Sequence, residues 1–145
     1  MNQININELL NNALALHHQG KLDDADEIYQ LVINGDANNF QANHLHGCIL
    51  SQKMQFEEAI TFLEKAISIE PNNYEANNNL GIAYKNIKSF VNSEKYFKNA
   101  ISIDSNNYKA LFNCANLYIE SDKYEEALNY LENSSNADIL FAEAP

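Results

Sequence analysis

A pentad of two asparagines, an aromatic residue, any residue and an alanine recurs three times in the chain at one fixed interval. Its copies begin at Asn38, Asn72 and Asn106, so both spacings, 72 − 38 and 106 − 72, are 34 residues. A constant period of this length is typical of helical hairpins in a row, because each hairpin buries its apolar side only against its neighbours. The sequence therefore predicts four helix-turn-helix repeats, over residues 6–39, 40–73, 74–107 and 108–141.

Other positions keep the same period when each repeat is counted from its first residue, 6, 40, 74 or 108. Position 8 is small, which allows the two helices of a hairpin to approach closely: Ala13, Gly47, Gly81 and Ala115. Position 17 is large and apolar: Leu22, Phe56, Phe90 and Tyr124. Position 20 is small again: Ala25, Ala59, Ser93 and Ala127.

This order of small and aromatic positions, with Pro71 closing the second repeat, resembles the tetratricopeptide repeat (TPR) family over residues 6–141. The resemblance implies an all-α fold, a right-handed superhelical solenoid that forms a single domain over residues 1–145. The sequence departs from the family at position 4, where Trp is frequent and this chain has Leu9, Asn43, Asn77 and Leu111.

Caps and turns divide each repeat into a first helix A and a second helix B. Asn39, Asn73 and Asn107 are natural N-caps for three A helices. Asn5, with Glu8 three residues later, predicts a capping box at the start of the first helix. Gly20 is expected in the turn inside the first repeat. Acidic pairs open three B helices, where they oppose the helix dipole, and this is a better interpretation of them than a catalytic pair: Asp23-Asp24, Glu57-Glu58 and Glu125-Glu126.

Composition narrows the range of partners. Twenty acidic residues against nine lysines give a formal net charge of −11, which disfavours binding to nucleic acid or to anionic membranes. Cys48 and Cys114 lie two repeats apart, too far for a disulfide, and are expected to be thiols in a reducing compartment. The sequence shows no signal peptide and no long apolar run. A cytoplasmic protein is predicted.

The TPR resemblance implies that the A helices line a concave groove, chiefly through positions 2, 5, 6, 9, 12 and 13. Among these residues Glu75 and Glu120 cancel the charges of Lys85 and Lys109, so the predicted groove is neutral and rich in amides. The net negative charge is therefore assigned to the turns, the B helices and the outer face, where it favours solubility.

Position 6 holds Asn11, Leu45, Asn79 and Asn113. An amide offers both a donor and an acceptor to a peptide backbone, so a row of asparagines at the repeat spacing is a plausible peptide track. The row resembles the asparagine ladder of O-linked N-acetylglucosamine transferases. Because Asn is common throughout the chain, a row without function stays open as the alternative. The peptide-binding residues predicted for the groove are Asn11, His44, Asn78, Asn79, Lys85, Lys109, Phe112, Asn113 and Asn116.

Two further resemblances concern the way in which the family binds its ligands. The segment from His17 to Leu22, with His44 to Gly47, looks like the N-terminal TPR segment of bacterial multidomain glycosyltransferases. The carboxylate clamp of chaperone-binding TPR domains is matched only by Asn79 and Lys109, so such a clamp is not expected.

No catalytic apparatus is visible in the sequence. Neither His17 with His18 nor His44 with His46 has the spacing of three or four residues that places two side chains on one helix face, so a metal site is not expected. The chain has no nucleophile elbow, phosphate loop or Cys-x-x-Cys pair. A protein that is not an enzyme and carries no cofactor or metal is predicted.

The sequence thus favours a non-catalytic protein-interaction module that binds an extended or short helical peptide in its groove. The alternative is the substrate-recruiting portion of a larger transferase whose catalytic domain lies outside this sequence. A third hypothesis is an assembly module, because Ile139, Leu140 and Phe141 follow helix B of the last repeat. These residues either fold back over that repeat or meet another molecule, and a homodimer through the C-terminal end is the favoured outcome.

Overall fold

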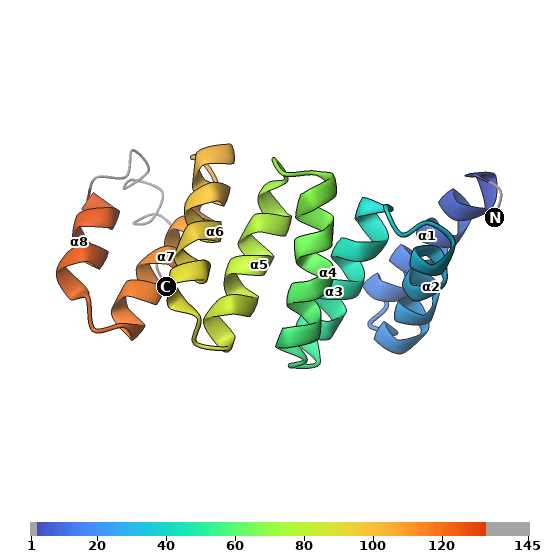
Figure 1. Cartoon of the computed structure of the whole chain (residues 1–145), viewed down its shortest axis with the longest axis horizontal. Helices are drawn as coiled ribbons and strands as arrows, with labels where there is room; N and C mark the ends of the chain where they lie inside the picture. Colours follow the sequence, from blue (N-terminus) through green and yellow to red (C-terminus); the bar gives the residue numbers. More distant parts are fainter. Residues whose placement is uncertain (1–2, 133–145) are drawn as a thin grey trace. The chain divides into compact units, whose positions relative to one another are not determined.

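The computed structural model describes residues 3–132, with side chains from residue 5, and divides the chain into two compact units, Met1–Pro71 and Asn72–Pro145. All regular elements in the described part are α-helices (Figure 1). Unit 1 contains α1 (Gln3–His18), α2 (Leu22–Gly35), α3 (Phe40–Gln52) and α4 (Phe56–Ile69). Unit 2 contains α5 (Tyr74–Asn86), α6 (Phe90–Ile103), α7 (Tyr108–Glu120) and α8 (Tyr124–Glu132). That the repeats form one domain stays a prediction.

The predicted period sets the helix boundaries. The A helices α3, α5 and α7 begin at residues 40, 74 and 108, and the B helices begin at 22, 56, 90 and 124. As predicted, the Asn39 side chain accepts a hydrogen bond from the Ala42 amide at 2.9 Å. The Asn73 side chain accepts in the same way from the Ala76 amide at 3.0 Å, whereas Asn107 accepts from the amide of Lys109, only two residues on, at 3.2 Å.

The predicted start of the first helix is wrong. Because α1 already begins at Gln3, Asn5 lies inside its first turn and does not stand before the helix as an N-cap. The Asn-Asn pentad that fixes the start of the other A helices does not precede α1, so the boundary lacked its strongest signal.

Each turn from helix A to helix B contains one residue with a left-handed backbone. These four residues are themselves 34 apart: Gly20 (φ 76°), Met54 (φ 59°), Lys88 (φ 64°) and Asp122 (φ 57°). The next amide then bonds back to a carbonyl five residues earlier, as Ser89 N–H does to the Tyr84 oxygen at 3.0 Å. This is the Schellman arrangement that satisfies the last carbonyls of a helix.

The two helices of a hairpin cross closely at position 8, as predicted. A Cβ on Gly81 would lie 2.5 Å from Cδ1 of Phe97, and a Cβ on Gly47 would lie 2.8 Å from Cγ of Leu63. Phe97 and Leu63 are fully buried, so neither has free space to move into. Glycine at these positions is what lets α3 pack on α4 and α5 on α6.

The asparagines at position 4 are structural. Asn43 and Asn77 are each 1% exposed. Asn43 Nδ2 donates to the Asn39 carbonyl at 2.8 Å and to the Ala37 carbonyl at 3.1 Å. Asn77 Nδ2 donates to the Asn73 carbonyl at 2.8 Å. Each amide therefore ties its A helix to the turn before it and replaces a large apolar side chain with a satisfied polar one.

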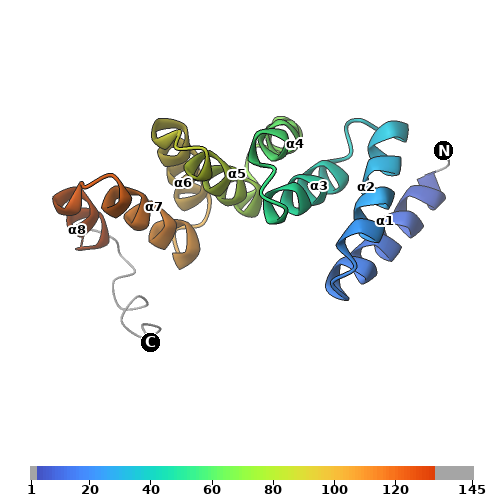
Figure 2. The ribbon, with the colours of Figure 1, turned by 90° about the horizontal axis from the view of Figure 1, so that it is seen from below.

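Within unit 2, α5 contacts both α6 and α7, and α7 contacts α8 (Figure 2). The two A helices, α5 and α7, are therefore neighbours as well as members of separate hairpins. This neighbourhood positions the candidate site.

Candidate functional site

The α5–α7 face is the surface that these two helices form with the side chains at positions 2, 5, 6, 9, 12 and 13. It contains seven of the predicted groove residues: Asn78, Asn79, Lys85, Lys109, Phe112, Asn113 and Asn116. The other two, Asn11 on α1 and His44 on α3, lie in unit 1.

Three polar contacts cross the α5–α7 face from one helix to the other. Asn113 Nδ2 donates a hydrogen bond to Asn78 Oδ1 at 3.0 Å. At one end of the helices Lys109 Nζ lies 4.0 Å from Glu75 Oε1. At the other end, Lys85 Nζ lies 3.3 Å from Glu120 Oε1. Each contact joins residues that are 34 or 35 apart, so the repeat period places the partners opposite each other.

A fourth contact is made by the aromatic residue at position 1. The Tyr74 hydroxyl accepts a hydrogen bond from the Ala110 amide at 2.7 Å and donates to the Asn107 carbonyl at 3.4 Å. A tyrosine hydroxyl is protonated at neutral pH, and burial raises the pKa of Tyr74 further, so the hydroxyl keeps its donor. Tyr74 thereby fixes the start of α7 against α5.

These contacts determine which groups of the α5–α7 face remain exposed for a ligand. Its two acids and two lysines are paired with each other, which agrees with the neutral groove predicted from the sequence. Asn78 is only 4% exposed, with its oxygen bonded to Asn113, so it supports the face from below. Phe112 is 52% exposed and Ile119 is 44% exposed, while Asn113 and Asn116 are half-buried beside them. The surface left for a ligand is thus apolar with amides and without unpaired charge.

The predicted residues of unit 1 have a different setting. Asn11 is exposed on α1. His44 is half-buried and stacks on Phe40 with ring centroids 5.5 Å apart. Burial lowers the pKa of His44, so its imidazole is neutral at pH 7.

A buried acid–histidine pair in unit 1 was not predicted. His46 Nδ1 lies 2.5 Å from Asp26 Oδ1, and both residues are buried. Asp26 Oδ2 also accepts a hydrogen bond from Gln30 at 2.9 Å, and the His46 ring meets Phe62 edge-on. The sequence alone predicts no role for Asp26, although an acid at position 21, where the next repeat has Ile60, is an available signal.

A second polar cluster joins α6 to α7. Glu94 accepts hydrogen bonds from the Tyr118 hydroxyl at 2.6 Å and from Lys98 Nζ at 2.5 Å. Lys98 and then Tyr118 lower the pKa of Glu94 by bonding to its ionised form. Burial and the bond to Glu94 raise the pKa of Tyr118 to about 12.

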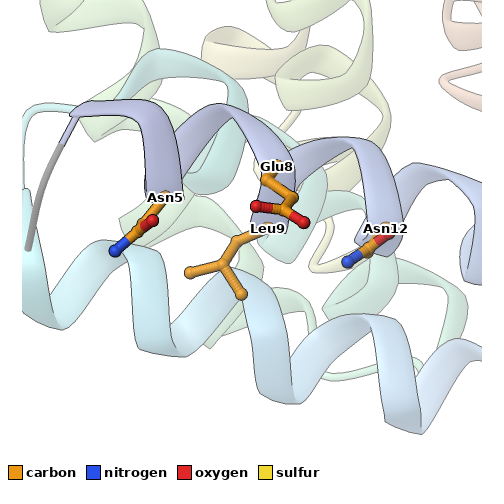
Figure 3. Close-up of a pocket in the computed structure, with 4 residues that line it drawn as sticks. All are labelled: Asn5, Glu8, Leu9 and Asn12. Atoms are coloured by element: carbon orange, nitrogen blue, oxygen red, sulfur yellow. The ribbon is translucent and has the colours of Figure 1, made fainter.

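A depression confined to one helix is less suited to a ligand. Asn5, Glu8, Leu9 and Asn12 line a shallow depression on α1 (Figure 3). All four come from one helix, so they do not converge on a bound molecule as the residues of a built site do. Among the described residues, no three His, Cys, Asp or Glu side chains are grouped so that they could hold a metal ion. The described helices are also too short or too polar to cross a membrane.

Capped hairpins at a 34-residue period, with neighbouring A helices joined across one face, define the chain as a helical repeat scaffold of the class that interacts with other proteins. The chain belongs to the tetratricopeptide repeat family. Residues 47–87 match a family model described as TPR repeat, and residues 88–138 match one described as tetratricopeptide repeat. No curated protein matches the sequence.

Solved structures of MamA share the fold. One described as a crystal structure of MamA superposes with a TM-score of 0.87 at 20% identity, covering 97% of this chain and 82% of that one. MamA from Desulfovibrio magneticus RS-1 gives 0.86 at 18% identity, with 97% and 78% covered. MamA AMB-1 gives 0.80 at 23% identity, with 97% and 75% covered. Identities this low show the common fold alone, and the resemblance to glycosyltransferase TPR segments stays a prediction.

Proposed function

We infer that the chain is a non-catalytic scaffold that binds a peptide segment of another protein on the exposed side of its A helices. The observation that carries this proposal is the α5–α7 face, where half-exposed Phe112 and Ile119 lie beside the amides of Asn113 and Asn116. Large apolar side chains rimmed by polar ones are typical of protein-binding surfaces. A cytoplasmic location is part of the same proposal.

Each predicted groove residue is assigned a role in peptide binding that suits its surroundings. Phe112 supplies apolar area, and the amides of Asn79, Asn113 and Asn116 supply backbone hydrogen bonds. Lys85 and Lys109, held by their acids, border the face, and Asn78 orients Asn113. In unit 1, Asn11 and His44 offer an amide and a neutral imidazole to the same kind of ligand.

The test is a selection of random peptides on the immobilised full chain. We expect the enriched peptides to lose binding to Phe112→Asn and to the triple variant Asn11/Asn79/Asn113→Ala, with folding checked by circular dichroism. Val91→Asn is the matched control, because Val91 is 82% exposed on α6, outside the face. A selection that enriches nothing above the empty matrix, or peptides that bind the triple variant equally well, would contradict the proposal.

A further inference from the structure

An apolar depression in unit 1 lies between the two B helices, α2 and α4, with one residue of α3 among its lining, and has a volume of about 510 Å³. This volume is within the range of ligand sites, and the residues that line it converge from three helices, unlike those of the depression on α1. We call it the Asn43 pocket, and five residues define it: Ile33, Ala37, Asn43, Thr61 and Phe62.

The aromatic wall of the pocket is uncovered because its neighbour is short. The Phe62 ring is half-buried and is held edge-on against His46, with ring centroids 4.4 Å apart. Thirty-four residues later Tyr96 takes the place of Phe62, and Lys95 takes the place of Thr61. Lys95 Nζ lies over the Tyr96 ring, 5.1 Å from its centroid. Thr61 is too short to cover Phe62 in that way, so the ring stays available to a ligand.

Asn43 is the most buried residue of the pocket and supplies its polar group. Its side chain is only 1% exposed. The two Nδ2 hydrogens are used within the protein, because they bond to the carbonyls of Ala37 and Asn39. Its Oδ1 accepts no hydrogen bond from any of the described residues. A buried acceptor without a donor is costly, so the pocket favours a ligand that brings one.

We propose that the Asn43 pocket binds the side chain of a tryptophan from a partner protein. The indole ring packs against Ile33 and Phe62, and its N–H donates to Asn43 Oδ1. The pocket lies in unit 1 and shares no residue with the α5–α7 face, so this site goes beyond the proposed function.

The pocket needs an apolar group that donates a hydrogen bond and accepts none, and an indole is such a group. Leucine or phenylalanine would leave Asn43 Oδ1 unsatisfied. A tyrosine hydroxyl or an amide would bring an acceptor, and the Thr61 hydroxyl already donates to the Glu57 carbonyl at 3.4 Å. Glu64 and Lys65, which also line the pocket, have opposite charges, so their net charge does not select a charged side chain.

The occupant has to come from another protein. The chain contains no tryptophan, so neither a second copy nor the chain's own C-terminal segment supplies an indole. The same fact makes the experiment direct, because all tryptophan fluorescence in a mixture with this protein comes from the ligand.

The test titrates the full chain into an end-blocked pentapeptide, Gly-Ser-Trp-Ser-Gly, and follows the fluorescence. We expect the emission to move to shorter wavelength, because the indole leaves water. A matched peptide with 1-methyltryptophan keeps the shape of the ring but has no N–H. It should bind about tenfold more weakly, or by about 1.4 kcal/mol, because Asn43 Oδ1 then stays unpaired. Amide chemical shifts in NMR spectra should change at Ile33 and Phe62.

Three variants test the pocket itself, with folding checked by circular dichroism. Ala37→Pro/Thr61→Lys introduces the residues that the next repeat has at these positions, Pro71 and Lys95, and should weaken binding at least tenfold by filling the space. Thr61→Ser keeps the space open and is the matched control, which should bind as the wild type does. Asn43→Leu should remove the preference for tryptophan over 1-methyltryptophan. If Asn43→Leu does not fold, the other two variants still decide whether the pocket is the site.

Other outcomes overturn the proposal in distinguishable ways. An unchanged emission up to the solubility limit of the peptide would remove the site, and equal binding of the two peptides would remove the role of Asn43 Oδ1. Chemical shift changes at Phe112 and Ile119 alone would move the tryptophan to the α5–α7 face and leave the proposed function standing. Tighter binding of N-acetyltryptophanamide than of the pentapeptide would assign the pocket to a small molecule. Binding that arises only in Leu140→Asp/Phe141→Asp would assign the pocket to the C-terminal segment of this chain or of a second copy.

Discussion

His46 Nδ1 lies 2.5 Å from Asp26 Oδ1 in the interior of unit 1, so that a buried acid–histidine pair joins α2 of the first repeat to α3 of the second. Such a pair stabilises a fold only while both members are present, because removing one leaves the other buried without its partner. At the corresponding positions 34 residues later the chain has Ile60 and Leu80. Positions 21 and 7 of the repeat thus accept buried polar side chains in one place and buried apolar ones in another.

We predict that His46→Leu alone destabilises the chain by about 3–5 kcal/mol, because it leaves Asp26 buried without its histidine partner. The double variant Asp26→Ile/His46→Leu should recover most of that loss, since a well-packed apolar pair is often as stable as a buried polar one. Urea unfolding of the single and double variants measures both values. A double variant no more stable than the single one would show that the pair is not the source of the loss.

A side chain on Gly81 should force α5 and α6 apart. Even the Cβ of an alanine at this position would lie within 2.6 Å of two atoms of the buried Phe97 ring. Gly81→Ala should therefore lower the melting temperature, and Gly81→Leu should lower it further. Overpacking of this kind costs about 1–3 kcal/mol. Glu126→Gln, on the exposed start of α8, is the control and should melt as the wild type does. Equal melting temperatures for all four proteins would contradict the close crossing.

The left-handed turns predict a stabilising substitution. Lys88 holds φ at 64°, which costs a residue with a Cβ about 1–2 kcal/mol, whereas glycine adopts it without strain. Glycine also has more conformational entropy in the unfolded chain, which opposes folding by about 0.5–1 kcal/mol. Lys88→Gly should therefore raise the free energy of unfolding by a net of about 0.5–1 kcal/mol. The converse change, Gly20→Ala, should destabilise, although a Cβ there has open space around it. Chemical denaturation measures the change in unfolding free energy for each variant. The prediction requires an increase for Lys88→Gly and a decrease for Gly20→Ala.

Glu94 should make the stability of the chain depend on pH. Its pKa is lowered in the folded chain by Lys98 and Tyr118, so its contribution is complete above the unfolded pKa, about 4.3, and is lost as the pH falls through the lower folded value. Tyr118→Phe removes one donor to the ionised carboxylate and should raise the Glu94 pKa in an NMR titration. Tyr124→Phe, whose hydroxyl donates to Asp122, is the matched control. An unchanged Glu94 titration in Tyr118→Phe would refute the assignment.

Association through the C-terminal end stays a prediction, because Ile139, Leu140 and Phe141 lie outside the described residues. Three consecutive apolar residues after helix B of the last repeat are expected to pair two copies. Light scattering over a concentration series should show a dimer that Leu140→Asp/Phe141→Asp converts to a monomer. A wild type that stays monomeric at high concentration would leave the pairing without support.

The fold was largely predictable because the period and the caps are local signals. Asn39, Asn73 and Asn107 locate three helix starts to the residue, and Gly81 marks a helix crossing. The start of α1 was not predictable, because no such pair of asparagines precedes it.

The site was predictable only in its composition. The sequence shows that the acids and lysines of the face balance, but only the packing of α5 on α7 shows that Lys109 meets Glu75 and Lys85 meets Glu120. Likewise, Asn78 and Asn113 look alike in the sequence, yet one is buried and the other is half-exposed. Which amide faces a ligand depends on the neighbouring helix, which residue type alone does not specify.

The contacts between α5 and α7 make the order of the repeats matter. Asn78 on the third repeat suits Asn113 on the fourth, and Lys85 suits Glu120, whereas Phe112 and Ile119 at the same two positions of the fourth repeat suit neither. Genetic exchange that transposed the third and fourth repeats would keep every helix and turn but would lose these two contacts, and a duplicated fourth repeat would add a junction without them. Although the four hairpins share one backbone plan, recombination among their coding segments would therefore yield junctions that match poorly.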